Sequence, residues 1–341
     1  MPWAKPWSNS PPHKRNEPPR TVARPGSTPL AVVLALLAPA ALTLAGCLPD
    51  FGGTGTTATT GEDTPGNHAA RPAGGAEEAP PAITAWDDLP DSFLPHRDFT
   101  LTLGDLRELL AGESSQIAET ILESPQEFLG LMGQALEMPR DLFVLVDKET
   151  PLPADYVPRD LVDLTKYQDR LTLNREGLSL RKILMPDLLA MVEEAAREGV
   201  ILDLSSTYRS YAYQEWLFQY WVDRIGQERA ERSSARPGSS QHQLGTAIDF
   251  GSVTGPFAEH PAGRWLAEKG WRYGFSLSYP QGYEDVTGYI YEPWHFRYIS
   301  RPGTRLERFF FDGIQQYFLE FWDRREPFFR ERYHSTSPSR W

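Results

Sequence analysis

The length, composition and charge of this chain exclude several classes of protein. With 341 residues, 40% of them hydrophobic, it is long enough for one large domain or for a medium domain with appendages. Its formal net charge of -12 argues against a nucleic-acid-binding protein, which needs a basic face for the phosphates. Its single cysteine, Cys47, excludes both an intramolecular disulfide and a site with several thiolate ligands.

Residues 1–46 have the three parts of a signal peptide. A segment with five basic residues precedes the apolar run LAVVLALLAPAALTLAG at 30–46, which ends in small residues at the expected cleavage site. Residues 44–47, LAGC, resemble a bacterial lipobox, which predicts cleavage before Cys47 and a lipid on its sulfur. The alternative is an anchor that stays attached, but Pro39 interrupts the run, which is short for a span of about 20 apolar residues. We therefore expect a lipoprotein on the extracytoplasmic side of a bacterial membrane, in the cell envelope.

Residues 47–84 have the composition of a flexible linker. This segment is rich in Gly, Thr, Pro and Ala and holds almost no large apolar side chain. Such a segment cannot bury enough surface to offset the loss of chain entropy on folding. It is therefore expected to tether a lipid-anchored protein to the membrane.

Residues 85–140 are predicted to form a helical extension without chemistry of its own. Apolar residues recur at helical spacing in three stretches, at 103–110, 117–122 and 128–136. Ser124 followed by Pro125 is a plausible helix start, because proline is favoured in the first helical turn. We expect the apolar stripes to pack against the rest of the protein.

Residues 141–300 have the pattern of an α+β domain. Strands are predicted at 142–146, 200–206, 244–250 and 293–299, and helices at 183–198, where Gly199 ends the pattern, and from about Tyr211 onward. Helices and strands do not alternate regularly, which argues against a doubly wound parallel sheet.

The C-terminal segment, 301–341, is predicted to be helical and is unusually aromatic. Large apolar residues follow helical spacing between 304 and 333, at Phe310, Ile314, Tyr317, Phe321 and Trp322. The simpler interpretation is a helix packed on the core. The alternative is a surface that contacts a partner or a membrane.

Two fragments contain candidate metal ligands. SSQHQLGTAIDFG (239–251) and YEPWHFRY (291–298) offer two histidines, an aspartate and a glutamate. A mononuclear zinc hydrolase needs this set: three protein ligands, an open position for water, and one unligated carboxylate to move protons. Either Asp249 or Glu292 can complete the ligand set with His242 and His295. If Glu292 and His295 face one metal, a turn near Pro293 is required, because residues i and i+3 of a strand point to opposite faces.

Together with STYRSYAYQ (206–214), these fragments resemble the VanY-type D-alanyl-D-alanine carboxypeptidases. These zinc peptidases share a fold with the hedgehog signalling domain, and their motifs read roughly S-x-YRS-x-x-x-Q, S-x-H-x-x-G-x-A-x-D and E-x-W-H. The chain matches every motif position, and the resemblance covers about 141–300. It implies a hedgehog/DD-peptidase-like domain with a small antiparallel sheet flanked by helices.

The resemblance also implies a role for each candidate site residue. It favours His242, Asp249 and His295 as ligands of Zn²⁺ and Glu292 as general base and acid. Arg209 corresponds to a substrate or transition-state contact, and its planar fork suits a carboxylate or an oxyanion. A structural ion pair is the alternative for Arg209. Two further residues, Gln214 and Ser240, correspond to hydrogen-bonding residues of the substrate pocket.

The function implied is a zinc carboxypeptidase that removes the terminal D-alanine from peptidoglycan stem peptides, with a zinc-bound water as nucleophile. The sequence does not distinguish D,D from L,D cleavage. The alternatives are a peptidoglycan endopeptidase of the same fold and a non-catalytic wall-binding lipoprotein. The intact Glu292 argues against the latter, because a binding module needs no general base. We expect a monomer that binds no nucleic acid.

Overall fold

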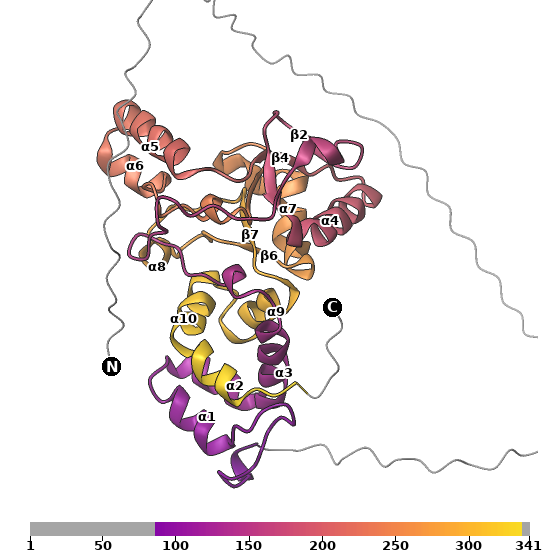
Figure 1. The fold of residues 1–341 in the computed structure, drawn as a ribbon, viewed down its shortest axis with the longest axis vertical. Coiled ribbons are helices and arrows are strands. Elements are labelled where there is room, and N and C mark those ends of the chain that lie inside the picture. The colour runs from indigo at the N-terminus through magenta and orange to yellow at the C-terminus, as the bar shows by residue number, and fades with distance from the viewer. Residues whose placement is uncertain (1–85, 336–341) are drawn as a thin grey trace, which may run out of the picture. The chain divides into compact units, whose positions relative to one another are not determined.

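The computed structural model describes residues 86–335 (Figure 1). The predicted signal peptide (1–46), the lipidation site Cys47 and the linker up to residue 84 lie outside the described residues. Short strands and helices are mixed along the described chain, as the α+β prediction requires. Within residues 86–335, no helix is both long enough and apolar enough to cross a membrane.

A five-stranded sheet lies at the centre of the predicted α+β domain, in the order β2-β4-β5-β7-β6. Its strands are β2 (Thr172–Leu173), β4 (Asp203–Ser206), β5 (Ala247–Phe250), β6 (Phe275–Leu277) and β7 (His295–Tyr298). All neighbouring strands are antiparallel except β2 and β4, which pair in parallel. A separate antiparallel pair joins β1 (Leu161–Asp163) to β3 (Ser179–Arg181). The predicted strands at 200–206, 244–250 and 293–299 are therefore confirmed in shortened form.

Helices flank this sheet. They are α4 (Met185–Arg197), α5 (Tyr211–Ile225), α6 (Gln227–Ser233), α7 (Pro261–Lys269) and α8 (Glu284–Thr287). The helix α4 forms where its pattern predicted, because Leu188, Met191 and Ala195 recur on one face and are buried there. Ser210 caps the start of α5 by accepting a hydrogen bond from the backbone N–H of Tyr213.

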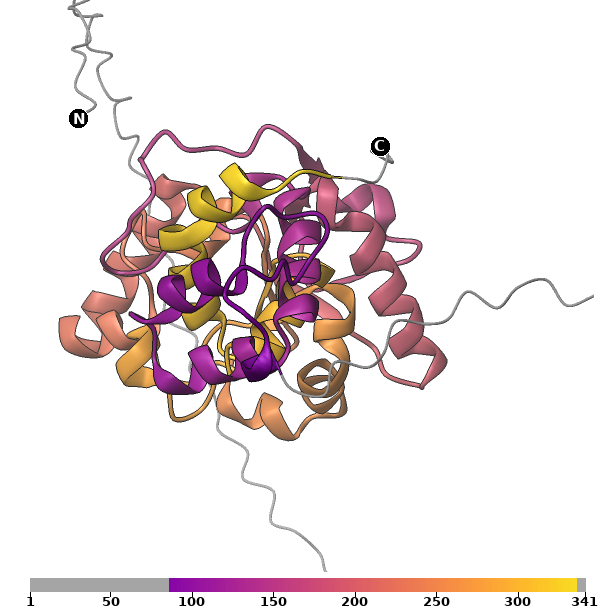
Figure 2. The ribbon, with the colours of Figure 1, turned by 90° about the horizontal axis from the view of Figure 1, so that it is seen from below.

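The N-terminal and C-terminal helices form one cluster, seen from below in Figure 2. Its members are α1 (Leu103–Leu110), α2 (Ser115–Glu123), α3 (Pro125–Leu136), α9 (Arg301–Phe310) and α10 (Gln315–Arg332). The ring of Phe128 in α3 contacts those of Phe310, Phe321 and Phe329, with centroids 5.2–6.1 Å apart. These helices share one hydrophobic core with the sheet region. The C-terminal aromatic residues are thus mainly core, as the simpler interpretation held.

Two expectations about local structure were wrong. The apolar run 142–146 is not a strand: a short 3-10 helix, Arg140–Leu142, leads into irregular chain. The carbonyls of Leu142 and Val144 accept hydrogen bonds from the buried Arg297 side chain instead of from a neighbouring strand. The C-terminal segment forms two helices rather than one. Asp312 and Gly313 have φ of 55° and 69°, and this left-handed backbone ends α9 before α10 begins.

Candidate active site

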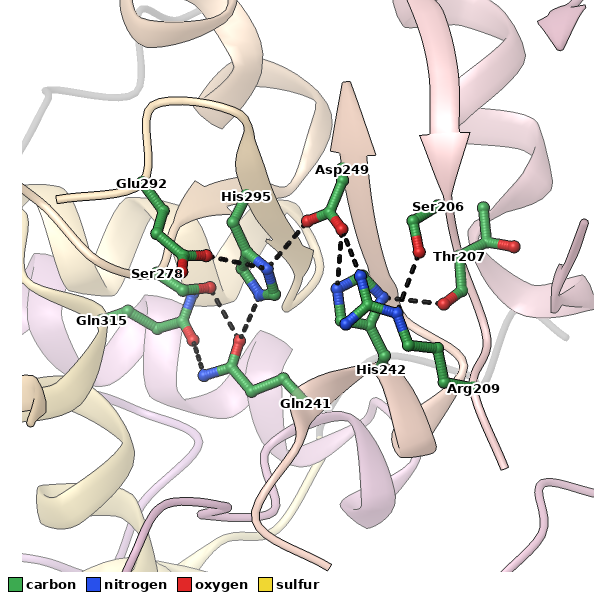
Figure 3. Close-up of polar contacts among 10 residues, drawn as sticks. All are labelled: Ser206, Thr207, Arg209, Gln241, His242, Asp249, Ser278, Glu292, His295 and Gln315. Atoms are coloured by element: carbon green, nitrogen blue, oxygen red, sulfur yellow. Dashed lines mark hydrogen bonds and ion pairs between the residues drawn. The ribbon is translucent and has the colours of Figure 1, made fainter. Parts of the chain in front are cut away.

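The pairing of β5 with β7 brings Asp249 and His295 together. The two residues are partners in the antiparallel register, so their side chains point to the same face of the sheet. Nδ1 of His295 lies 3.0 Å from Oδ1 of Asp249, and both side chains are buried. Nε2 of His295 faces Oε1 of Gln241 at 3.3 Å (Figure 3). The sheet thus places two of the predicted ligands side by side.

The ring of His242 reaches the same point from a short 3-10 helix, Gln241–Leu244. Its Nδ1 lies 2.7 Å from the carbonyl oxygen of Thr207, and a carbonyl only accepts, so Nδ1 carries the proton. Nε2 is then a lone pair directed at Asp249 Oδ2, 3.2 Å away. Burial and the charge of Arg209 lower the pKa of His242 to about 4. The ring is therefore neutral at physiological pH, as a metal ligand must be.

The cluster fits a metal ion. One ligand atom each from His242, Asp249 and His295 lies within 4.8 Å of the others, and no second such group occurs among residues 86–335. Nε2 of His242 is buried and makes no hydrogen bond, although an acceptor oxygen of Asp249 lies close by. Two facing lone pairs in a dry site repel each other unless a cation lies between them. Two imidazoles and one carboxylate are a ligand set that Zn²⁺ accepts in catalytic sites.

Arg209 follows β4 and is paired with the predicted ligand Asp249. Its Nη2 donates to Asp249 Oδ2 at 2.5 Å, and its Nε donates to Ser206 Oγ at 3.0 Å. Nη1 makes no hydrogen bond to any residue between 86 and 335, and Arg209 lines the cavity described below. Burial opposes ionisation of Asp249, but Arg209 and the two imidazoles hold the pKa of this carboxyl well below its usual range. The structural ion pair and a free donor for substrate thus coexist in one guanidinium group.

Glu292 stands beside the cluster without belonging to it. The backbone N–H of His295 donates to the Glu292 carbonyl at 3.0 Å, which closes a tight turn around Pro293 and confirms the predicted turn. Oε2 of Glu292 lies 3.7 Å from His295 Nδ1. Burial, followed by the negative charge of Asp249, raises the pKa of Glu292 well above its usual value. The geometry therefore favours Asp249 over Glu292 as the third ligand and leaves Glu292 free to exchange protons.

A cavity of about 480 Å³ opens onto these residues. Ser240 lines it, as does Trp294, together with Arg209, Glu292 and the three predicted ligands. Further wall residues come from α5 and from the chain around β6 and α8: Tyr213, Leu217, Trp221, Tyr279 and Tyr289. The lining of the cavity thus combines charged and candidate metal-binding side chains with aromatic and aliphatic ones.

Gln214 does not line this cavity. It is buried in α5, where its Nε2 donates to the carbonyl oxygen of Ala235 at 2.7 Å. Ala235 lies in the loop that leads to Ser240 and does line the cavity. Gln214 therefore joins α5 to that loop, and its position does not support the predicted contact with substrate.

The structure also adds residues that the sequence pattern did not single out. Ser206 and Thr207 orient Arg209 and His242, Gln241 faces His295, and the ring of Tyr279 lies 4.9 Å from that of His295. Ser206, Thr207 and Gln241 lie inside or beside the motifs, so their position in the chain was a usable signal. Nothing in the sequence marks Tyr279, which reaches the site only through the fold.

Comparison with known proteins identifies the family. A model of the VanY family, described as D-alanyl-D-alanine carboxypeptidase, matches residues 177–301. The D-alanyl-D-alanine carboxypeptidase of Enterococcus faecium is 32% identical over 169 residues, which are 48% of this chain and 52% of that protein, so the chain spans about half of this relative. The bifunctional D-Ala-D-Ala dipeptidase and D-Ala-D-Ala carboxypeptidase VanXYC of Enterococcus gallinarum is 30% identical over 173 residues, 48% of this chain and 85% of that protein. A VanY D,D-pentapeptidase from a VanB-type resistance cassette, solved with Zn(II), aligns with a TM-score of 0.44 at 27% identity, covering 53% of this chain and 99% of that one.

Proposed function

Because the chain belongs to the VanY family of D-alanyl-D-alanine carboxypeptidases, we propose that it is a zinc-dependent carboxypeptidase acting on peptidoglycan stem peptides. The leaving group would be the terminal D-alanine. The observation that carries this proposal is the pair of facing lone pairs on His242 and Asp249, with His295 beside them and a free carboxyl at Glu292.

His242 Nε2, Asp249 and His295 Nδ1 would hold the zinc ion. Zinc supplies a Lewis acid that lowers the pKa of a coordinated water to about 7 and polarises the scissile carbonyl. The protein keeps both imidazoles in the correct orientation, through Thr207 for His242 and through Gln241 for His295. Such outer partners fix which ring nitrogen is free to bind metal.

Glu292 is the proton carrier in this mechanism. Its carboxyl lines the cavity, and its Oε2 lies 3.7 Å from Nδ1 of His295, one of the three candidate metal ligands. Burial and the charge of Asp249 raise its pKa, which makes the carboxylate a stronger proton acceptor. It therefore takes a proton from the water and delivers it to the departing D-alanine nitrogen.

Arg209 selects for a free carboxylate in this proposal. Ser206 and Asp249 hold two of its donor nitrogens, Nη1 makes no hydrogen bond to residues 86–335, and Arg209 lines the cavity. A carboxypeptidase must recognise the chain end, whereas an endopeptidase must accept a continuing chain. A fixed guanidinium donor at the wall of the cavity favours the first activity.

We also propose a location for the enzyme in the cell. The basic segment, the apolar run and LAGC at 44–47 favour a lipoprotein anchored through Cys47, with residues 48–84 as tether. A peptidoglycan substrate outside the cytoplasmic membrane is consistent with that location. We further propose that the enzyme acts as a monomer.

Release of D-alanine from synthetic stem peptides tests the proposal. Purified protein should release D-alanine from a pentapeptide or a tetrapeptide, lose this activity with a chelator, and regain it with zinc. His242→Ala should bind much less zinc and lose activity in parallel. Undiminished release of D-alanine by chelator-stripped protein would refute the zinc mechanism. Cleavage within a cross-linked peptide, without release of D-alanine, would support an endopeptidase.

A further inference from the structure

We propose that Gln315, at the start of α10, is a positioning residue for the metal site, acting through Gln241 on the ligand His295. The inference rests on the proposed zinc site but concerns a part of the chain to which the sequence assigned no chemistry. Gln315 lies beyond residues 177–301, where the family match is found. The C-terminal helices would then do more than cover the core.

A continuous chain of hydrogen bonds joins Gln315 to His295 (Figure 3). Nε2 of Gln241 donates to Gln315 Oε1 at 3.1 Å, and Oε1 of Gln241 faces His295 Nε2 at 3.3 Å. The hydroxyl of Ser278 donates to the same Gln241 oxygen at 2.7 Å. Gln241, Ser278, Gln315 and His295 are each at most 4% exposed, so bulk water does not compete for these groups.

The direction of the chain is set at its far end. Gln315 Nε2 donates to Ser276 Oγ at 2.9 Å and to Ser278 Oγ at 3.2 Å. Ser276 has one hydroxyl hydrogen, and it donates this hydrogen to Glu307 Oε1. A reversed Gln315 amide would therefore turn its oxygen toward the Ser276 oxygen, which has no hydrogen left to give.

This direction determines which nitrogen of His295 can bind metal. Because Gln315 presents its oxygen to Gln241, Gln241 must present its Nε2 to Gln315 and its Oε1 to His295. The Gln241 oxygen opposite His295 Nε2 favours the proton on that nitrogen, which leaves Nδ1, facing Asp249 Oδ1, as the nitrogen available to a metal ion. A Gln241 amide turned the other way would favour the proton on Nδ1 and block the ligand atom.

The alternative is a buried polar network that stabilises the fold without affecting the metal. The neighbouring Gln316 provides a matched control. It is also buried, and its Nε2 donates to Asp147 Oδ2 and to Glu320 Oε1, both at 2.9 Å. None of these contacts leads to His295. Gln315→Met and Gln316→Met therefore remove similar buried hydrogen bonds, but only the first releases the Gln241 amide.

Zinc affinity, measured by competition with a chromophoric chelator, tests the proposal on the full-length protein. Gln315→Met should weaken zinc binding about 10–100-fold, the effect typical of residues that orient metal ligands, whereas Gln316→Met should leave it unchanged. The visible spectrum of the Co²⁺-substituted protein should shift in Gln315→Met alone, because the geometry of its ligands changes. Equal zinc affinities and equal Co²⁺ spectra for the two variants would overturn the proposal.

A second variant covers the case in which Gln315→Met does not fold. Ser278→Ala removes the other hydrogen bond that holds Gln241 Oε1 and should also weaken zinc binding. An unchanged affinity in that variant would count against the network. The readout is metal binding, so it is separate from hydrolysis. Wild-type protein that binds zinc but releases no D-alanine would refute the proposed function and leave this inference standing, whereas wild type that binds no zinc would refute both.

Discussion

Removing the Arg209 guanidinium should impair cleavage of a peptide with a free terminal carboxylate far more than cleavage of its C-terminal amide. Ser206 and Asp249 occupy Nε and Nη2, so Nη1 is left for the substrate. One charge-assisted hydrogen bond contributes about 1.5–3 kcal/mol. Since 1.36 kcal/mol corresponds to a factor of ten in rate, Arg209→Ala should lower kcat/KM for the free acid by about 10–150-fold.

The assay is a cycle of two enzymes and two substrates. Wild type and Arg209→Ala are compared on a stem pentapeptide and on the same peptide amidated at its C-terminus, with excess enzyme for the slow pairs. Wild type should lose most activity on the amide, and Arg209→Ala should lose little more, because the same contact is already absent. Zinc content is measured in both proteins, since Arg209 also pairs with the buried Asp249.

Two results would refute this reasoning in different ways. If Arg209→Ala lowers kcat equally on the free-acid and the amidated peptide, with KM little changed, Arg209 stabilises the oxyanion and does not bind the terminal carboxylate. If wild type cleaves the amide efficiently, the free carboxylate is not recognised at all, and the endopeptidase alternative gains support. A normal rate of Arg209→Ala on the free acid would exclude both roles.

Further predictions concern the base, the anchor, a buried carboxyl and a glycine. Glu292→Gln should keep zinc while kcat falls about 10²–10⁴-fold; near-normal turnover would exclude it as the base. Cys47→Ser should abolish lipid labelling and move the protein from the membrane to the soluble fraction, and a mature chain still carrying residues 1–46 would contradict the anchor. Burial raises the pKa of Glu307 to about 8, so the folded state holds a proton that the unfolded state loses near pH 4.5, and stability falls as pH rises between these values. In urea unfolding, the free energy of unfolding should fall with pH by up to about 1.4 kcal/mol per pH unit more in wild type than in Glu307→Gln. The same pH dependence in both proteins would contradict the raised pKa of Glu307. Gly245→Ala should lower Tm more than Gly177→Ala. Both glycines have left-handed φ (69° and 74°), but only at Gly245 would an added Cβ meet a neighbouring atom, Leu161 Cδ2 at 2.9 Å. Equal losses of Tm would show that backbone strain alone matters.

The candidate metal ligands were visible in two short fragments of the sequence, and the resemblance to the VanY family favoured Asp249 over Glu292 as the third ligand. His242, Asp249 and His295 were each assigned from short motifs, and the structure brings all three within reach of one ion. The turn at Pro293 followed from strand geometry together with the requirement that Glu292 and His295 face one metal. Helix α4 and the start of α5 were also predictable, since side-chain periodicity and a capping Ser210 act within a few residues.

Two differences between local pattern and structure have the same physical cause, which is that the deciding partner is distant in the sequence. The run 142–146 has the composition of a strand, but the Arg297 side chain, more than 150 residues away, takes two of its carbonyls. Gln214 has a motif position suited to a pocket, but the fold turns its amide toward Ala235. No local pattern contains either contact.

The sequence by itself thus determined which side chains could hold a metal and move a proton, because ligand type and spacing are properties of the chain. Only the tertiary structure decided how those side chains are held. The lone pair of His242 is aimed by the Thr207 carbonyl, 35 residues away, and Gln241 meets Gln315 across 74 residues. A buried hydrogen bond depends on the position and direction of both partners, and packing sets these after the chain has folded.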